Sequence, residues 1–344
     1  MLGPVFYASV QARVRARYSD LLSEKRWREL LAAETLEDLG QILRDTPYGQ
    51  AFRVAPVEFE RNLIAHWALE LYTLTHSLHS GPRDLMRWYA RKFELDNLKT
   101  VLRTLSYRQL PGRAEEVLLP LEPPTLAWSR LLEVASVQAL IAELRDTPYA
   151  APLTDALERY LQEGSPFYLE VSIDLGYFQH LVRLMNRLDG QDRRWAERLL
   201  GSWIDLQNLL WAYRYRVYAR LSPEEIVNYT LHHAVRIDVD AVRRAATGSP
   251  LWREAERLGL ELSSQLDERK ALEELEMTGF REIVRRAHAA FDGLLFHVGS
   301  VLAYAFLLEA EVHDLITLIE GKRHDMTAEK LGPYFLGEDR YVRA

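Results

Sequence analysis

The hexapeptide Leu-Arg-Asp-Thr-Pro-Tyr occurs twice in this chain, at residues 43–48 and again at residues 144–149. Identity over six consecutive residues indicates an internal repeat, and a repeat constrains the whole architecture. The segments before the two copies also agree. Each begins with a hydroxyl residue, Thr35 or Ser136, and continues with apolar residues three and four apart. This pattern predicts a short helix with a side-chain N-cap and one buried face.

Each of these helices is expected to end before the proline of the hexapeptide. Proline cannot extend a helix, and it disfavours the helical conformation at the residue before it. A weaker third copy begins at Asp238 and has Leu251 where the first two copies have tyrosine. The markers of the repeat are Pro47, Tyr48, Pro148, Tyr149 and Pro250.

A second marker follows in each copy, with the pattern acid, aliphatic, any residue, Asn or Asp, Leu. Each instance lies inside a long stretch of helical periodicity, at residues 88–105, 195–218 and 296–319. The polar residues of the marker are Glu94, Asn97, Asp205, Asn208, Glu311 and Asp314.

An acid retained at equivalent points of three divergent copies has a reason inside the fold, and two interpretations remain open. The first is structural: the carboxylate is buried or half-buried and pairs with an arginine of a neighbouring helix, while the Asn or Asp satisfies nearby polar groups. The second is functional: these residues line or brace a central socket that binds a partner.

A third marker, a small residue or proline followed by an acid, predicts a helix start at residues 114–117, 223–226 and 328–331. Three markers in the same order, three times, indicate a triplication. We expect three related helical bundles, at residues 1–122, 123–228 and 229–344. Strand-like alternation is nearly absent, so the predicted fold is all-α. Three such bundles can close around a threefold axis or stack as an open arc.

Composition excludes several classes of protein. The net charge of −7 provides no electrostatic footprint for nucleic acid. The chain has no cysteine, which fits a reducing compartment, and its first residues lack the pattern of a secretory signal. The uncharged stretch 293–308 is too short to span a bilayer and predicts a buried helix instead of membrane insertion. A cytoplasmic location is therefore expected.

The sequence contains no nucleotide-binding or metal-binding signature, so no catalytic, cofactor or metal residue is predicted. The nearest candidate is Glu309 with His313, four residues apart on one helix; a metal site and solvated surface charge are the alternatives. Near the N-terminus, Arg13, Arg15 and Arg17 alternate with small apolar residues. Ion pairs within the chain and contact with an acidic partner are the two interpretations of these arginines.

Several segments resemble the C subunit of V-type (archaeal and bacterial A/V-type) ATPases, the counterpart of the d subunit of eukaryotic V-ATPase. The resemblance extends over the chain and is weaker in its last third, where Leu251 follows Pro250 and Asp314 replaces the Asn. The segments that carry it are residues 7–22, 43–49, 93–103, 167–181 and 203–216.

The resemblance implies a funnel of three helical bundles about a pseudo-threefold axis, with a central socket. Such a protein is a non-catalytic collar of the central stalk. It binds the D and F subunits of the rotor shaft in its socket and rests on the membrane proteolipid ring, as one monomeric copy peripheral to the membrane. The complex couples ATP synthesis or hydrolysis to proton or sodium transport. The alternative is a helical scaffold or adaptor without a rotary role, for which an elongated arc is expected.

Overall fold

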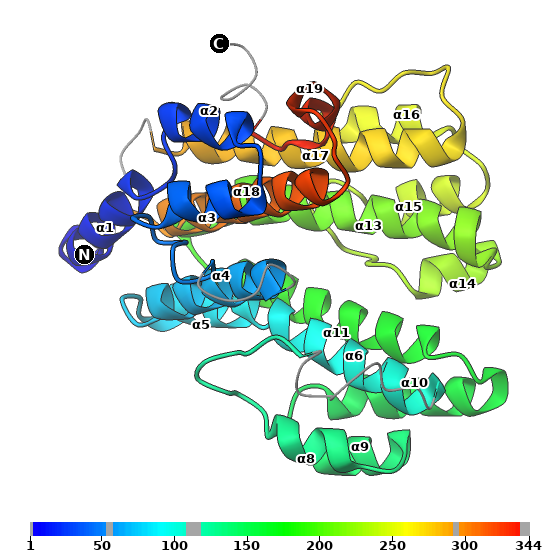
Figure 1. The fold of residues 1–344 in the computed structure, drawn as a ribbon. Helices are drawn as coiled ribbons and strands as arrows, with labels where there is room; N and C mark the ends of the chain where they lie inside the picture. The colour runs from blue at the N-terminus through cyan, green and yellow to red at the C-terminus, as the bar shows by residue number, and fades with distance from the viewer. Residues whose placement is uncertain (1–2, 53–57, 108–117, 292–295, 338–344) are drawn as a thin grey trace.

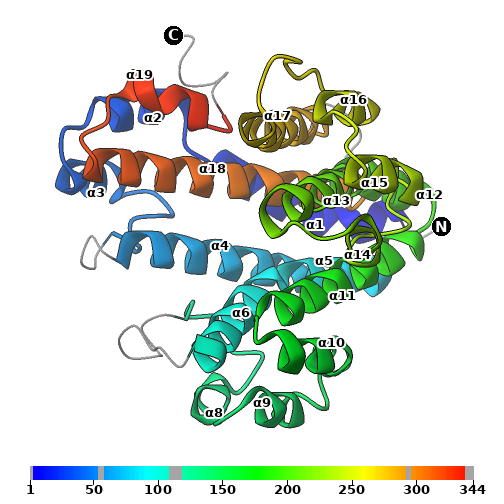
Figure 2. The ribbon, with the colours of Figure 1, turned by 90° about the vertical axis from the view of Figure 1, so that its right-hand side faces the viewer.

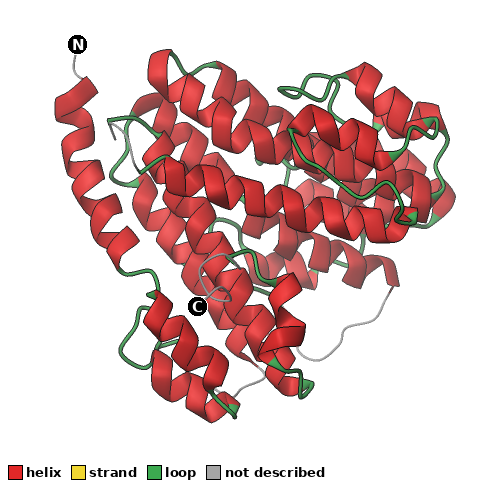
Figure 3. Cartoon of the chain, turned by 90° about the horizontal axis from the view of Figure 1, so that it is seen from above, coloured by secondary structure: helices red, strands yellow, loops and turns green. Residues whose placement is uncertain are grey.

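The computed structural model describes residues 3–52, 58–107, 118–291 and 296–337. These residues form helices joined by short connections, with no β-strand among them, which confirms the all-α prediction (Figures 1 and 3). Within these residues no helix has the length and apolar character needed to cross a bilayer. The predicted helix start at 114–117 lies outside the described residues.

The first part of the chain folds into helices of very different length. They are α1 (Gly3–Ser19), α2 (Glu24–Ala32), α3 (Leu36–Leu43), α4 (Phe59–Thr75), α5 (Ser80–Ala90) and α6 (Lys92–Tyr107). The predicted helix over 88–105 is divided, because α5 ends at Ala90. Arg91 follows in a tight turn, in which the Arg91 N–H donates to the carbonyl of Trp88.

The middle of the chain repeats an order of short and then long helices. The segment closest to a strand in sequence, 167–178, is helical throughout. The elements are α8 (Trp128–Glu133), α9 (Val137–Glu143), α10 (Ala150–Glu163), α11 (Phe167–Asn186), α12 (Gly190–Ala196), a π-helical turn (Glu197–Gly201), α13 (Ser202–Arg214) and a second π-helical turn (Tyr215–Ala219).

The last part of the chain ends with the two longest helices and a short final one. Its elements are α14 (Pro223–Asn228), α15 (Val239–Ala246), α16 (Leu251–Ala255), a 3₁₀ turn (Glu256–Leu258), α17 (Glu268–Ala289), α18 (Gly299–Arg323), α19 (Ala328–Leu331) and a second 3₁₀ turn (Gly332–Tyr334). Helices α14 and α19 begin where the third sequence marker predicts.

The three short helices predicted from the repeat all form, and each has the predicted N-cap. Thr35 accepts the N–H of Asp38 at 3.1 Å, Ser136 accepts that of Ala139 at 3.2 Å, and Asp238 accepts that of Ala241 at 2.8 Å. Each cap satisfies an N–H group that the first turn of a helix leaves without a partner.

The long helices pack on short helices from the next part of the chain. Helix α6 contacts α9, α13 contacts α15, and α18 contacts α3. The last contact joins the end of the chain to its beginning, so the sequence of contacts is a closed cycle. In Figure 2 the short helices lie at three corners of the molecule, with α2 and α3 at one, α14 to α16 at another, and α8 and α9 at the third.

Candidate functional site

The retained acids bind tyrosine hydroxyls and backbone N–H groups, and Glu94 also lies 3.9 Å from Arg91 at the end of α5. Glu311 on α18 accepts the hydroxyl of Tyr48 at 2.7 Å and the backbone N–H of Leu22 at 2.9 Å. Glu94 on α6 accepts the hydroxyl of Tyr149 at 2.5 Å. Both carboxylates are buried. In two copies, therefore, the acid accepts a hydrogen bond from the hexapeptide tyrosine of a different copy.

The third acid, Asp205 on α13, has no tyrosine to bind, because Leu251 occupies the equivalent position. Its carboxylate instead accepts backbone N–H groups of Val235, Arg236 and Ile237 at 2.8 to 3.2 Å. Burial raises the pKa of Asp205, and these N–H bonds oppose that shift because they stabilise the ionised form. The third acid is thus also hydrogen-bonded to another segment of the chain, but its donors are backbone N–H groups instead of a tyrosine hydroxyl.

The side-chain amide of each Asn in the second marker forms two hydrogen bonds with the backbone of a single leucine. Asn97 accepts the N–H of Leu119 at 2.7 Å and donates to its carbonyl at 3.0 Å. Asn208 does the same with Leu231, at 2.7 and 2.9 Å.

The third copy makes the equivalent contact with a carboxylate in place of the amide. Asp314 cannot donate, and it accepts two N–H groups instead, from Leu336 at 2.7 Å and Gly337 at 2.9 Å. All three side chains are buried and tie a long helix to the segment that follows it.

The hexapeptide copies have the same local geometry. Thr46 donates its hydroxyl to the carbonyl of Leu43 at 2.7 Å, and Thr147 donates to Leu144 at 2.6 Å. Pro47 and Pro148 lie just beyond the ends of α3 and α9, as predicted from their inability to continue a helix.

In the third copy Pro250 lies directly before α16, in extended conformation. The hydroxyl of Tyr213 donates to the carbonyl of Ser249 at 2.7 Å, which ties the end of α13 to this turn.

The N-terminal arginines behave differently from one another. Arg17 forms an ion pair with Glu70 on α4. Arg13 is exposed and donates to the hydroxyl of Ser77 at 2.9 Å. Arg15 is exposed and forms no ion pair with any described residue. No ion pair joins any of the three to Glu94, Asp205 or Glu311 among the ion pairs of the described residues.

A cavity of about 440 Å³ lies where the long helices meet. Its walls come from α4, α6, α11, α13, α17 and α18, which are two helices from each predicted unit. Lys92, Trp203 and Glu309 lie at equivalent positions, each two residues before the retained acid, and all three line the cavity. Lys92 Nζ is 2.9 Å from Glu309 Oε2.

Aromatic rings surround the Lys92 ammonium. Its Nζ lies 3.8 Å from the ring centroid of Trp67 and 4.6 Å from that of Tyr89, and Tyr89 also donates its hydroxyl to Glu309. Burial lowers the pKa of Lys92, and the adjacent Glu309 carboxylate opposes the shift. The inner end of the cavity is therefore a buried ion pair in an aromatic setting.

The lining side chains are less exposed at the Lys92 end of the cavity than further along the helices. Buried Tyr89 lies beside Lys92, and its ring contacts that of buried Phe306. Two turns further along α6, Lys99 pairs with Asp174 of α11 at 2.6 Å, and both side chains are 20% exposed. Arg214 on α13 is 38% exposed. The mouth thus lies toward the C-terminal ends of α6 and α13.

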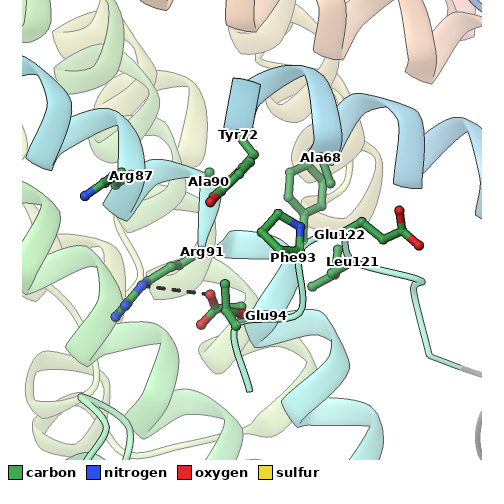
Figure 4. A pocket seen from close by; sticks show the side chains of 11 residues that line it. Ala68, Tyr72, Arg87, Ala90, Arg91, Phe93, Glu94, Leu121 and Glu122 are labelled. Atoms are coloured by element: carbon green, nitrogen blue, oxygen red, sulfur yellow. Dashed lines mark ion pairs between the residues drawn. The ribbon is translucent and has the colours of Figure 1, made fainter. Parts of the chain in front are cut away.

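A smaller cleft of about 240 Å³ lies on the outer side of α6 (Figure 4). Glu94 and Arg91 form part of its wall, 3.9 Å apart, and Pro123, whose peptide bond with Glu122 is cis, closes another side. Glu94 therefore faces this cleft and Tyr149, and it does not line the central cavity.

The metal-site alternative for Glu309 and His313 finds no support in the geometry. Glu309 binds Tyr89 and Lys92, whereas His313 is exposed and its Nδ1 lies 3.2 Å from Asp314. No group of three or more potential metal ligands occurs among the described residues.

Sequence reasoning missed the cavity residues Lys92 and Trp203, and it considered Glu309 only as a metal ligand together with His313. All three stand at the same offset in the aligned second marker, and the fold brings these three positions to the wall of one cavity. Because a lysine, a tryptophan and a glutamate share no chemistry, a search for repeated residue types does not find them.

Comparisons with known proteins agree with the resemblance. The C subunit of the A-type ATP synthase of Methanocaldococcus jannaschii is 24% identical over 344 residues, which cover 94% of this chain and 85% of the relative. That of Halobacterium salinarum (strain R1) is 26% identical over 354 residues, 96% of this chain and 97% of the relative. The family described as ATP synthase (C/AC39) subunit matches residues 10–334. The chain therefore belongs to the ATP synthase (C/AC39) subunit family.

Proposed function

We propose that this chain is the non-catalytic collar of the central stalk of a rotary V/A-type ATPase. In this role one copy sits at the cytoplasmic side of the membrane and couples the D–F rotor shaft to the proteolipid ring, for ATP-linked proton or sodium transport. The observation that carries the proposal is the central cavity, which receives walls from all three parts of a chain in this family.

The packing supports a role in transmitting torque. The contacts of α6 with α9, α13 with α15 and α18 with α3 form a closed cycle, so a load on one helix reaches the others without a flexible linker. The same cycle counts against the elongated arc expected of an adaptor.

The proposal is tested by binding of the purified chain to the D–F shaft and to the detergent-solubilised ring. We expect both to bind, and the chain alone to hydrolyse no ATP. Failure to bind either partner would refute the proposal.

A cavity variant identifies the binding surface. Gln207→Trp places a bulky ring in the cavity wall and should weaken shaft binding at least about tenfold, because a filled pocket excludes its partner. Gln138→Trp introduces the same side chain on the exposed face of α9 and serves as the matched control. Equal shaft binding by both variants would place the shaft elsewhere.

A further inference from the structure

Four arginines at the C-terminal ends of α5 and α11 are here called the arginine patch: Arg87, Arg91, Arg183 and Arg187. The first two are one turn apart at the end of α5 and line the same cleft (Figure 4). The other two lie at the end of α11. His180 connects the two helices, because its ring stacks on Trp88 of α5 at 3.9 Å. Burial, followed by the charges of Arg183, Arg91 and Arg187, lowers the pKa of His180, as expected for groups on one surface.

The patch is not neutralised within the chain. Arg87, Arg183 and Arg187 are exposed, and none has a carboxylate within 4.0 Å among the described residues. Glu170 and Asp174 on α11 pair with Arg103 and Lys99, and buried Glu94 on α6 lies 3.9 Å from Arg91. The exposed acids next to the patch in the chain are Asp84 on α5 and Asp189, two residues after Arg187. Glu122 lies on the opposite side of the cleft (Figure 4).

Arginines elsewhere on the surface are often paired, as in Arg103–Glu170 and Arg130–Glu143. In a chain of net charge −7, the patch is therefore a local reversal of sign.

Along α11, Arg183 and Arg187 lie beyond the residues that contact Lys99 and Tyr89, on the side away from the cavity mouth. Helix α11 runs antiparallel to α5 and α6: Glu170 pairs with Arg103, Asp174 pairs with Lys99 at the mouth, and Tyr177 donates to the carbonyl of Tyr89 at the inner end. Further along the chain from Tyr177, His180 and Arg183 follow on α11. Leu188, just after α11, packs against Gly81 at the start of α5. A partner on the patch is thus separated from a partner in the cavity.

We propose that the arginine patch is the docking surface for an acidic segment of the membrane ring, that is, a polypeptide carrying Asp or Glu side chains. This inference rests on the proposed function, which assigns the cavity to the shaft and leaves the opposite end for the ring. Arginine suits such a partner because its planar guanidinium binds a carboxylate through two parallel hydrogen bonds. The cleft beside Arg91 has apolar walls, including Ala68 and Leu121, that fit the stem of an acidic side chain.

The observations favour a protein partner over anionic lipid. A lipid-binding surface combines basic residues with exposed apolar anchors, and neither α5 nor α11 has an exposed large hydrophobic residue. The negative charge of the whole chain also repels an anionic bilayer at long range, whereas arginine–carboxylate pairs act at short range.

The test compares two triple variants with the same change in net charge. Arg87→Glu/Arg183→Glu/Arg187→Glu reverses the patch, and Arg44→Glu/Arg145→Glu/Arg253→Glu reverses three exposed arginines elsewhere. Binding is measured to the detergent-solubilised ring, to the D–F shaft and to phosphatidylglycerol vesicles. We expect the patch variant to bind the ring at least about tenfold more weakly while binding the shaft normally, and the control variant to bind both as the wild type does.

Other results would overturn the inference. Ring binding by the patch variant equal to that of the wild type excludes the patch. Vesicle binding by the wild type that the patch variant loses assigns the patch to lipid. If the wild type binds neither ring nor shaft, the proposed function fails together with the inference, and this outcome is distinguishable from the first two. Circular dichroism checks folding, and the milder Arg183→Gln/Arg187→Gln variant, with an expected intermediate loss, replaces the triple variant if that one unfolds.

Discussion

At the scale of single residues, the chemistry of each side chain decides which backbone groups it satisfies. An amide both donates and accepts, so Asn97 and Asn208 each pair with the N–H and the carbonyl of a single leucine. A carboxylate only accepts, so Asp314 binds two successive N–H groups instead. The departure from the repeat pattern at residue 314 is therefore matched by a change in hydrogen bonding that leaves the contact intact.

Asn208 offers the clearest test at this scale. Asn208→Ala leaves the buried N–H and carbonyl of Leu231 without partners, and we expect it to lower the free energy of unfolding by about 2–4 kcal/mol. Asn208→Asp should also destabilise, because the carboxylate faces the carbonyl of Leu231. Urea denaturation measures both. Gln207→Ala, at the neighbouring half-buried position, is the control, with an expected change within about 0.5 kcal/mol.

His66 gives the chain a pH-dependent stability. It packs against Tyr48, and burial together with the charge of Arg17 lowers its pKa below the ordinary value of 6.5. The unfolded chain then binds the proton more readily than the folded one, so its contribution to stability is complete above pH 6.5 and is lost as the pH falls toward the lowered pKa. In urea denaturation from pH 7.5 to 5.5, the wild type should lose more stability than His66→Gln. An equal loss of stability in the wild type and in His66→Gln over this pH range would show that His66 is not the source of the pH dependence.

At the scale of elements, each long helix is tied to a short helix that lies outside its own predicted unit. The hydroxyl of Tyr149, after α9, reaches Glu94 on α6, and that of Tyr48, after α3, reaches Glu311 on α18. Burial and the neighbouring Glu94 raise the pKa of Tyr149, so the phenol remains a donor. The hexapeptide that reveals the repeat in sequence is thus an attachment between successive parts of the chain.

The hydroxyls of Tyr149 and Tyr48 are expected to contribute unequally to the free energy of unfolding. Tyr149→Phe removes the 2.5 Å hydrogen bond to buried Glu94 and should cost about 1.5–3 kcal/mol, the range for bonds to a charged group. Tyr48→Phe should cost less, because Glu311 retains the N–H of Leu22. Thermal or urea unfolding of the two variants measures the difference, and the reverse order would show that backbone donors do not compensate. Tyr107→Phe, at an exposed position, is the control.

At the scale of the whole molecule, the closed cycle of contacts brings three equivalent positions together at the inner end of the cavity. Lys92 and Glu309 form an ion pair there, with side chains only 13% and 16% exposed. The pair joins residues more than two hundred positions apart in the chain. Its partial burial means that each charge depends on the other.

This pair is expected to behave non-additively. Lys92→Met or Glu309→Leu alone leaves a buried charge unpaired and should destabilise by about 3–5 kcal/mol. The double variant Lys92→Met/Glu309→Leu removes both charges and should recover most of that loss, because apolar side chains suit the surrounding aromatic rings. A double-mutant cycle from urea denaturation gives the coupling energy. A double variant as unstable as the sum of the two single variants would show that the residues do not interact.

Local sequence patterns were enough to predict the helices of the repeat and their ends. An N-cap at Thr35, Ser136 or Asp238 and a proline at a fixed distance act within a few residues, so their effect does not depend on the rest of the chain. The burial of Glu94, Asp205 and Glu311 was also an interpretation drawn from their retention in three copies.

The partners of these acids could be found only in the folded molecule, because a tyrosine hydroxyl or a backbone N–H from the next part of the chain leaves no local signal. The meeting of Lys92, Trp203 and Glu309 likewise depends on how the long helices cross, which side-chain packing over the whole chain determines.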